Sequence, residues 1–247
     1  PDLVPTAEPY AKRTAQGLIL GPDGEKMSKS RGNVIDPNDV VEEYGADVLR
    51  LYVLFMGDYE KAAPWSQSSI KGCKRFLERV WGLQDILVDG DDYSEAMKSS
   101  FHKTIKKVSE DIENMKFNTA IAAMMALIND IYAAGSVNKA EYAAFCMLLN
   151  PFAPHITEEM YNLVFGKVLS EQSWIQYDEA LCKDDMIEIV VQINGKLKSK
   201  LMIPADADKD AVLAMALEDE KVKEAVEGKT IIKQIYVPNK LVNIVAK

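Results

Sequence analysis

The chain has 247 residues, 48% of them hydrophobic and 27% charged, and its 29 basic against 38 acidic residues give a formal net charge of −9. This composition excludes a disordered or collagen-like chain, and the length suffices for one or two domains with ordinary cores. No uninterrupted apolar run approaches the ~18 residues of a membrane helix. Three scattered cysteines, Cys73, Cys146 and Cys182, indicate neither a disulfide framework nor a metal site, and we expect a cytoplasmic protein without membrane contact.

The net charge is unevenly distributed along the chain. Residues 186–247 hold 10 lysines and 9 acidic residues, so they carry +1, and residues 1–185 carry −10. A negative total argues against a nucleic-acid partner, because Lys and Arg supply most of the affinity for phosphate groups. The division means that each basic patch has to be judged separately.

Residues 1–35 are rich in proline and glycine and are predicted to form mainly loops. An apolar strand is expected at residues 18–20, followed by a turn at residues 21–24, where proline fixes one φ angle and glycine accepts the left-handed conformation. The chain begins at Pro1 without an initiator methionine, which suggests a piece of a longer protein.

Residues 36–65 are predicted to form connecting helices. Asp36 is suited to cap a helix whose first position is Pro37, since proline needs no hydrogen-bond acceptor there. Gly45 is expected to separate two short helices that share an apolar stripe.

Residues 66–182 carry the spacing of a helical bundle. Apolar residues recur at intervals of three and four over five segments, at residues 70–87, 97–115, 121–132, 142–149 and 154–165. Helices of this length bury one another's apolar stripes, which predicts a bundle.

The last residues, 186–247, change to a period of two. Apolar residues alternate up to the pair Asn194-Gly195, which is typical of a tight hairpin turn. One or two helices at residues 206–226 and strands at 231–237 and 241–245 complete a ββαββ domain, separated from the bundle by an acidic linker at 183–185. The fold class expected is therefore mainly α, a helical bundle with a small C-terminal α+β domain.

The most informative motif is a short loop in which two lysines flank a Met-Ser pair: Lys26, Met27, Ser28, Lys29 and Ser30. Lys26 and Lys29 are candidates to bind a triphosphate, while hydroxyl and amide groups of the loop donate hydrogen bonds. Each charge-assisted contact contributes roughly 1.5–3 kcal/mol, and contacts that strengthen as pyrophosphate leaves accelerate the step by ~10–100-fold. The alternative is a solvated surface loop without a function.

These five residues spell the second signature of the class I aminoacyl-tRNA synthetases, and residues 32–37 continue the pattern. Residues 45–50 resemble the helix that follows this loop in the family. Residues 150–159 resemble the entry to the last helix of the anticodon-binding bundle in the leucine, isoleucine and valine group. The resemblance implies that residues 26–30 bind ATP and that Lys26 and Lys29 are catalytic, because they stabilise the leaving pyrophosphate.

Within that group, the ββαββ ending resembles the C-terminal domain of bacterial-type leucyl-tRNA synthetases, whereas the valine enzymes end in a coiled coil and many isoleucine enzymes carry a cysteine zinc site. The resemblance implies a monomeric ligase that uses ATP with Mg²⁺ to activate leucine and transfers it to tRNA(Leu). In these terms residues 1–35 are a remnant of the catalytic domain, 36–65 a stem-contact region, and 66–182 and 186–247 tRNA-binding domains.

The same resemblance limits what this chain is expected to do alone. The first class I signature, His-x-Gly-His, needs two histidines three positions apart, but the chain has only His102 and His155. The leucine pocket is likewise expected outside the chain, so the isolated chain is predicted not to form an aminoacyl-adenylate. Two alternatives stay open: the corresponding part of a valyl or isoleucyl enzyme, and a free-standing tRNA-binding module.

Two groups of basic residues are candidate tRNA contacts. The first lies on the first bundle helix and comprises Lys71, Lys74, Arg75 and Arg79. The second comprises Lys196, Lys198 and Lys200, which the period of a strand places on one side. A solvated polar face is the alternative for each group; the strand group is favoured, because three aligned lysines form a local patch. The resemblance implies that this small domain lies against the tRNA elbow, where its contacts are expected to be to the backbone rather than to bases.

Overall fold

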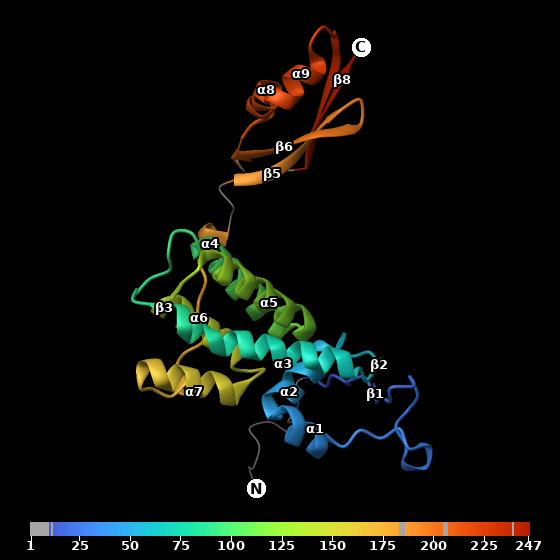
Figure 1. Cartoon of the computed structure of the whole chain (residues 1–247), viewed down its shortest axis with the longest axis vertical. Coiled ribbons are helices and arrows are strands. Elements are labelled where there is room, and N and C mark those ends of the chain that lie inside the picture. The colour runs from blue at the N-terminus through green and yellow to red at the C-terminus, as the bar shows by residue number, and fades with distance from the viewer. Residues whose placement is uncertain (1–9, 11, 183–185, 205–206, 239) are drawn as a thin grey trace. The chain divides into compact units, whose positions relative to one another are not determined.

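The structure is a computed structural model that describes residues 10, 12–182, 186–204, 207–238 and 240–247. The predicted acidic linker at 183–185 lies outside the described residues. The chain divides into two compact units, Pro1–Cys182 and Lys183–Lys247, which we call the helical unit and the C-terminal unit (Figure 1). The predicted fold class, mainly α with a small α+β domain at the end, is confirmed.

The helical unit begins with a short strand and two short helices. Strand β1 (Ile19–Leu20) pairs in parallel with β2 (Ala63–Pro64), and helices α1 (Pro37–Tyr44) and α2 (Ala46–Phe55) lie between them in the sequence. The carboxylate of Asp36 caps α1 by accepting a hydrogen bond of 2.8 Å from the Asn38 amide, as predicted. Gly45 separates α1 from α2 with a φ of 93°, which favours glycine.

The five predicted bundle helices are confirmed. They are α3 (Gln67–Trp81), α4 (Lys98–Glu113), α5 (Phe117–Ala134), α6 (Lys139–Leu149) and α7 (Pro154–Phe165). The 3₁₀ segments η2 (Gly82–Ile86), η3 (Leu169–Glu171) and η4 (Glu179–Cys182) and the parallel pair β3 (Leu87–Val88) and β4 (Val137–Asn138) connect or flank them. Another 3₁₀ segment, η1 (Lys29–Arg31), lies earlier in the chain, before α1.

Helix α3 ends earlier than its apolar stripe predicts. The stripe continues to Leu87, but the α-helix stops at Trp81 and the chain tightens into η2. The Tyr132 hydroxyl on α5 donates a hydrogen bond of 2.8 Å to the Arg79 carbonyl, and a Cβ at Gly82 would lie 2.9 Å from that hydroxyl oxygen. The Tyr132 side chain of α5 therefore lies at the point where α3 ends.

Helix α5 lies in the core of the bundle. It is long and apolar enough to cross a membrane by length and composition alone, although it contains Asn129 and Asp130. One of its faces is buried within the hydrophobic core, through Ala120, Ile121, Met124, Leu127, Ile128 and Ile131. This is the arrangement of a core helix in a bundle.

A buried carboxylate fastens the start of α6 to the loop before α4. Glu141 and Asn138 form a capping box at the helix N-terminus. Glu141 is only 2% exposed, and its other oxygen accepts hydrogen bonds from the Ser94 amide (2.9 Å) and hydroxyl (2.6 Å). One side chain thus satisfies donors from two segments that are far apart in the sequence.

The C-terminal unit is a four-stranded sheet covered on one face by two helices. Its elements are β5 (Met186–Ile193), β6 (Lys196–Pro204), α8 (Lys209–Glu218), α9 (Glu220–Val226), β7 (Ile231–Val237) and β8 (Leu241–Ala246), with strand order β6-β5-β8-β7. The central strands β5 and β8 are parallel. Asn194 and Gly195 have φ angles of 50° and 77°, so the predicted hairpin turn is confirmed. The core of this unit joins the inner face of the sheet to Val212, Ala216 and Val222.

Replacing Glu141 by alanine is expected to lower the free energy of unfolding of the helical unit by about 2–4 kcal/mol, because the Ser94 and Asn138 donors lose their buried acceptor. Urea titration followed by tryptophan fluorescence measures this unit specifically, since all three tryptophans lie within it. The exposed Glu113→Ala variant is the control, with an expected change within about 0.5 kcal/mol. Equal effects of the two substitutions would contradict the role of the buried carboxylate.

Candidate active-site loop and nucleic-acid surfaces

The loop that carries the lysines starts as a tight hairpin directly after β1. Leu20 and Lys26 form an isolated antiparallel bridge, and the Gly21 amide donates a hydrogen bond of 2.8 Å to the Glu25 carbonyl. The turn closes through a hydrogen bond of 2.9 Å from the Gly24 amide to the Gly21 carbonyl, with Gly24 at a φ of 76°. The loop therefore starts from the β1–β2 pair of the helical unit.

The five residues of the signature divide between the core and the solvent. Met27 is half-buried and packs against the hydrophobic core of the helical unit. Lys26 and Lys29 are exposed, and within the described part of the chain neither has an ion-pair partner. The hydroxyl oxygens of Ser28 and Ser30 lie 2.8 Å apart. The two ammonium groups are thus available to an anionic ligand, while Met27 anchors the backbone between them.

The amide side chain of Asn33 connects several parts of this loop. Its Oδ1 atom accepts a hydrogen bond of 2.8 Å from the Ser28 amide. Its Nδ2 atom donates to both carboxylate oxygens of Asp23, each at 3.1 Å, and lies 3.4 Å from the Lys26 carbonyl oxygen. The hydrogen bonds from Asn33 to Asp23 are the largest cause that lowers the pKa of Asp23 below its ordinary value, because they stabilise the charged carboxylate.

The carboxylate of Asp47 joins α2, the second helix after the loop, to α7, the last bundle helix. Asp47 lies in the first turn of α2 and is buried, and its oxygens accept hydrogen bonds from the Ile156 amide (2.7 Å) and the His155 amide (3.4 Å) at the start of α7. The Nδ1 atom of His155 lies 2.7 Å from the same carboxylate. No side chain within α7 caps that helix, so Asp47 supplies the missing acceptor from 108 residues away.

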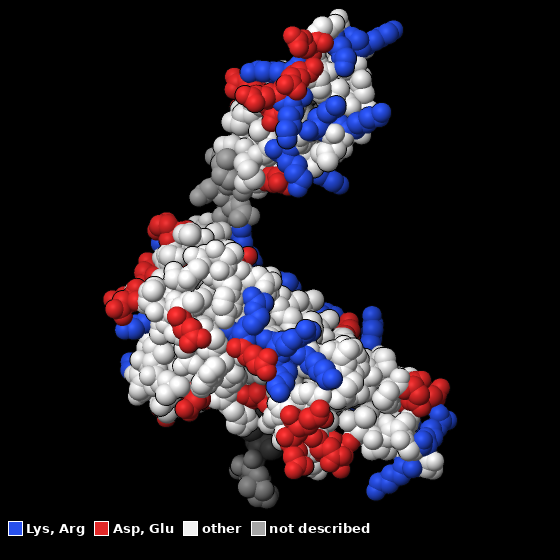
Figure 2. Space-filling view, viewed as in Figure 1, with Lys and Arg blue, Asp and Glu red and all other residues white. Residues whose placement is uncertain are grey.

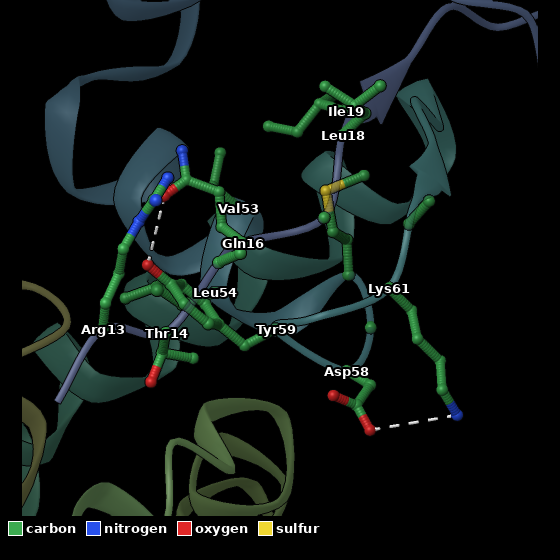
Figure 3. Close-up of a pocket in the computed structure, with 15 residues that line it drawn as sticks. Arg13, Thr14, Gln16, Leu18, Ile19, Val53, Leu54, Asp58, Tyr59 and Lys61 are labelled. Atoms are coloured by element: carbon green, nitrogen blue, oxygen red, sulfur yellow. Dashed lines mark hydrogen bonds and ion pairs between the residues drawn. The ribbon is translucent and has the colours of Figure 1, made fainter.

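A cleft opens near the N-terminal side of the loop but does not contain its lysines. It has a volume of about 820 Å³ and lies between residues 13–19, the end of α2 and the segment after it (Figure 3). Val53 and Leu54 contribute apolar surface, while the Tyr59 hydroxyl donates a hydrogen bond of 3.4 Å to Gln16. The candidate chemistry of the loop is therefore not placed in this cleft.

The basic residues of α3 are brought together on one exposed surface. Lys and Arg side chains gather over α3, with acidic side chains beside them (Figure 2). Lys71, Lys74 and Arg75 are exposed. Arg79 is held by the bundle itself, because it donates a hydrogen bond of 2.8 Å to Asn129 and its guanidinium lies 4.9 Å from the centre of the Tyr132 ring. All four candidate residues are thus exposed, and Arg79 differs from the other three in that its guanidinium is engaged by α5.

The expectation that Lys196, Lys198 and Lys200 share one side of a strand is wrong. Paired residues lie on the same face of a sheet, and Lys196 pairs with the buried Ile193, whereas Lys200 pairs with Val190 on the opposite face. A β-bulge at Lys198 adds one residue between them, so the alternation of side chains between the two faces is shifted by one. In addition, Lys200 forms an ion pair of 2.8 Å with Glu188.

Charge in the C-terminal unit is instead segregated between the strands and the helices. Residues 208–227, which form α8 and α9, hold seven acidic residues and three lysines. Residues 186–204 and 228–247, which form the strands, hold seven lysines and a single acidic residue. Figure 2 shows this division, with red side chains over the helices. All three predicted lysines belong to the basic part.

Within the described ranges, no group of three or more His, Cys, Asp or Glu side chains is arranged to hold a metal ion. Burial raises the pKa of the Cys73 thiol to about 11 and that of the Cys146 thiol further still, so both remain protonated near neutral pH.

Comparison with known proteins identifies the class. Residues 4–66 match the family model "tRNA synthetases class I (I, L, M and V)", and residues 95–213 match "Anticodon-binding domain of tRNA ligase". The leucine–tRNA ligase of Alkaliphilus oremlandii is 53% identical over 246 residues, which cover 99% of this chain and 31% of that protein. A LeuRS of Agrobacterium radiobacter K84, crystallised in a ternary complex with tRNA and LeuAMS, matches with a TM-score of 0.76 and 32% identity over 98% of this chain and 34% of that one.

The chain belongs to the class I aminoacyl-tRNA synthetases. Within that class it corresponds to part of a leucine–tRNA ligase, as the sequence predicted. It spans about a third of the length of these relatives, 31% of one and 34% of the other.

Sequence reasoning missed the residues that hold the site together. The sequence places Asn33 only in a family pattern and Asp23 only in a turn, although the amide of one and the carboxylate of the other can form hydrogen bonds across the loop. Asp47 follows Gly45-Ala46 in a family pattern, but no local signal indicates that it caps α7. Long-range hydrogen bonds of this kind leave no periodic trace in the sequence.

Substituting Asn33 by alanine is expected to raise the pKa of Asp23 towards its ordinary value, because the carboxylate loses two hydrogen bonds that favour its charged form. The change is measured by NMR titration of the aspartate side-chain carboxyl carbons. Asp89, whose pKa is lowered by its ion pair with Lys139, is the internal reference and should not move. An unchanged Asp23 titration would show that the Asn33 contact is absent in solution.

Proposed function

We propose that this chain is the part of a leucine–tRNA ligase that supplies the pyrophosphate-binding loop and the tRNA-binding surfaces. The observation that carries the proposal is the loop of residues 26–30, whose two lysines are exposed while Met27 fixes the backbone between them. In the whole enzyme, ATP with its Mg²⁺ ion and leucine are the substrates of the first step, and tRNA(Leu) accepts the leucyl group in the second.

The loop suits the first step because it offers positive charge without an internal partner. Leucine's carboxylate attacks the α-phosphorus of ATP, the bond to the bridging oxygen breaks, and pyrophosphate leaves with additional negative charge. The ammonium groups of Lys26 and Lys29 stabilise that charge, and the hydroxyls of Ser28 and Ser30 and the Met27 backbone complete the ATP-binding loop. Contacts that strengthen as the bond breaks lower the activation barrier and leave substrate affinity little changed.

In the full-length enzyme, Lys29→Ala is expected to slow leucyl-adenylate formation by ~10–100-fold while leaving leucine affinity nearly unchanged, because the lost contact forms chiefly in the transition state. Single-turnover adenylation by rapid quench gives the rate, and equilibrium binding of leucine gives the affinity. Lys12→Ala, which removes an exposed lysine outside the loop, is the charge-matched control. An unchanged adenylation rate in Lys29→Ala would refute the assignment.

We propose two tRNA-binding surfaces. One is the surface of α3 with Lys71, Lys74, Arg75 and Arg79, where Arg79 contributes mainly by holding the surface, since its guanidinium is engaged with Asn129 and Tyr132. The other is formed by the basic strands of the C-terminal unit, which carry Lys196 and Lys200 on opposite faces of the sheet and Lys198 at the bulge between them. The segregation of lysines on the strands from acidic residues on α8 and α9 supports the second surface, because a local positive field attracts phosphates even when the domain is nearly neutral.

Replacing Lys196, Lys198 and Lys200 by glutamine is expected to weaken binding of the chain to tRNA(Leu) and to reduce the slope of log affinity against log salt by about 1–3, depending on how many of them contact phosphates. Lys200 should contribute least, because Glu188 already neutralises it. Gel-shift or fluorescence titrations at several salt concentrations measure the slope.

The matched control for this triple variant replaces Lys209, Lys221 and Lys223 of the helical side by glutamine. It removes the same charge from the same unit, so it should leave the slope almost unaltered. An equal decrease in both variants would indicate that only net charge matters and would contradict a strand-side surface.

We further propose that the enzyme acts as a monomer in the cytoplasm, without membrane contact. The burial of α5 in the bundle supports the last point, because the one helix with membrane-like length and composition among the described residues is used in the core.

A further inference from the structure

We propose that Asn33, held by Asp23, is a positioning residue that sets the direction of Lys26 and Lys29 in the loop. The inference rests on the proposed function of that loop and adds two residues to it. Neither residue is proposed to touch the substrate. Both act through the backbone that carries the two lysines.

The first step of the argument is where the Asn33 amide makes its contacts. It accepts from the Ser28 amide at 2.8 Å and lies 3.4 Å from the Lys26 carbonyl oxygen, so it contacts both peptide groups that flank Met27. Ser28 has φ −151° and ψ 137°, an extended conformation that Met27 and Asn33 secure from two sides. Lys26 and Lys29 leave the backbone on either side of this fixed segment.

The second step concerns the orientation of Asn33 itself. An amide group can be turned so that its nitrogen and oxygen exchange places, and only the hydrogen-bond partners decide between the two orientations. The Asp23 carboxylate accepts hydrogen bonds but cannot donate them, so it requires the Nδ2 atom at 3.1 Å from both of its oxygens. The Oδ1 atom must then face the Ser28 amide. Asp23 therefore selects the orientation in which Asn33 holds the loop.

The third step is the space that these groups occupy. A Cβ built on the buried Gly21 would lie 2.6 Å from an Asp23 carboxylate oxygen and 2.8 Å from the Asn33 Nδ2 atom. Only a residue without a side chain leaves room for the pair. The Glu25 amide also donates to Asp23 at 3.1 Å, which ties the carboxylate to the turn of the hairpin.

The experiment exchanges the two side chains in the full-length enzyme. N33D places two carboxylates against each other and removes the donors to Asp23, so we expect the adenylation rate constant at saturating ATP to fall about 10–100-fold, as misplaced catalytic groups do. The double variant D23N/N33D restores an amide facing a carboxylate, with a carboxylate oxygen still accepting from the Ser28 amide. It should recover most of the lost rate. N38D makes the same chemical change on the exposed surface of α1 and should not alter the rate.

A second measurement on the chain itself separates this inference from the proposed function. The Ser28 amide should be protected from hydrogen exchange in the wild type and in D23N/N33D, but not in N33D. An N33D enzyme with normal adenylation, or a double variant that recovers neither the rate nor the protection, would overturn the inference. If instead the wild-type enzyme shows no leucine-dependent pyrophosphate exchange, the proposed function fails, while the exchange data still decide whether Asn33 holds the loop.

Discussion

The arrangement of the helical unit depends on the hydrogen bonds between the Asp47 carboxylate and the start of α7. Asp47 lies in the first turn of α2, which α1 separates from the loop, and its carboxylate accepts hydrogen bonds from the amides at the start of α7, the last helix of the bundle. Arg50, one turn further along α2, donates a hydrogen bond of 3.0 Å to the Pro151 carbonyl just before the same helix. Two side chains of α2 thus hold the start of α7: Asp47 accepts from its first amides, and Arg50 donates to a carbonyl just before it. The helices after the loop are thereby fixed to the bundle that is proposed to bind tRNA.

Lys26 and Lys29 differ from the other polar residues of the loop, which have partners within it. Arg31 is paired with Glu25 at 3.3 Å, and Asn33 is bonded to Asp23 and to the Ser28 amide. Exposed ion pairs such as Arg31–Glu25 contribute little to stability. The positive charge of Arg31 is nevertheless balanced by Glu25 and is less available to a ligand. In the described part of the loop, Lys26 and Lys29 are the cations without such a partner. Positive charge is therefore left for a ligand on a backbone that is already held in place.

Local signals were sufficient to predict most of the elements. Asp36 and Pro37 marked the start of α1, Asn194-Gly195 marked the hairpin of the C-terminal unit, and the three-and-four spacing located all five bundle helices. Contacts between distant residues decided the rest. Tyr132 occupies the place where α3 ends, and the bulge at Lys198 placed Lys196 and Lys200 on opposite faces. Asp47 and Asn33 act through hydrogen bonds to backbone groups, which any sequence offers, so their roles could not be predicted from spacing.

The rigid connection between the loop and the bundle can be tested by one distance measurement. Spin labels at V34C and L163C, two exposed positions, in a C182S background report the separation of the loop from α7 by pulsed electron resonance, since Cys73 and Cys146 are buried and stay unlabelled. A single narrow distance distribution that broadens when Asp47 is replaced by alanine is the predicted result. A broad distribution in the presence of Asp47, or one that the Asp47→Ala substitution leaves unchanged, would contradict the account.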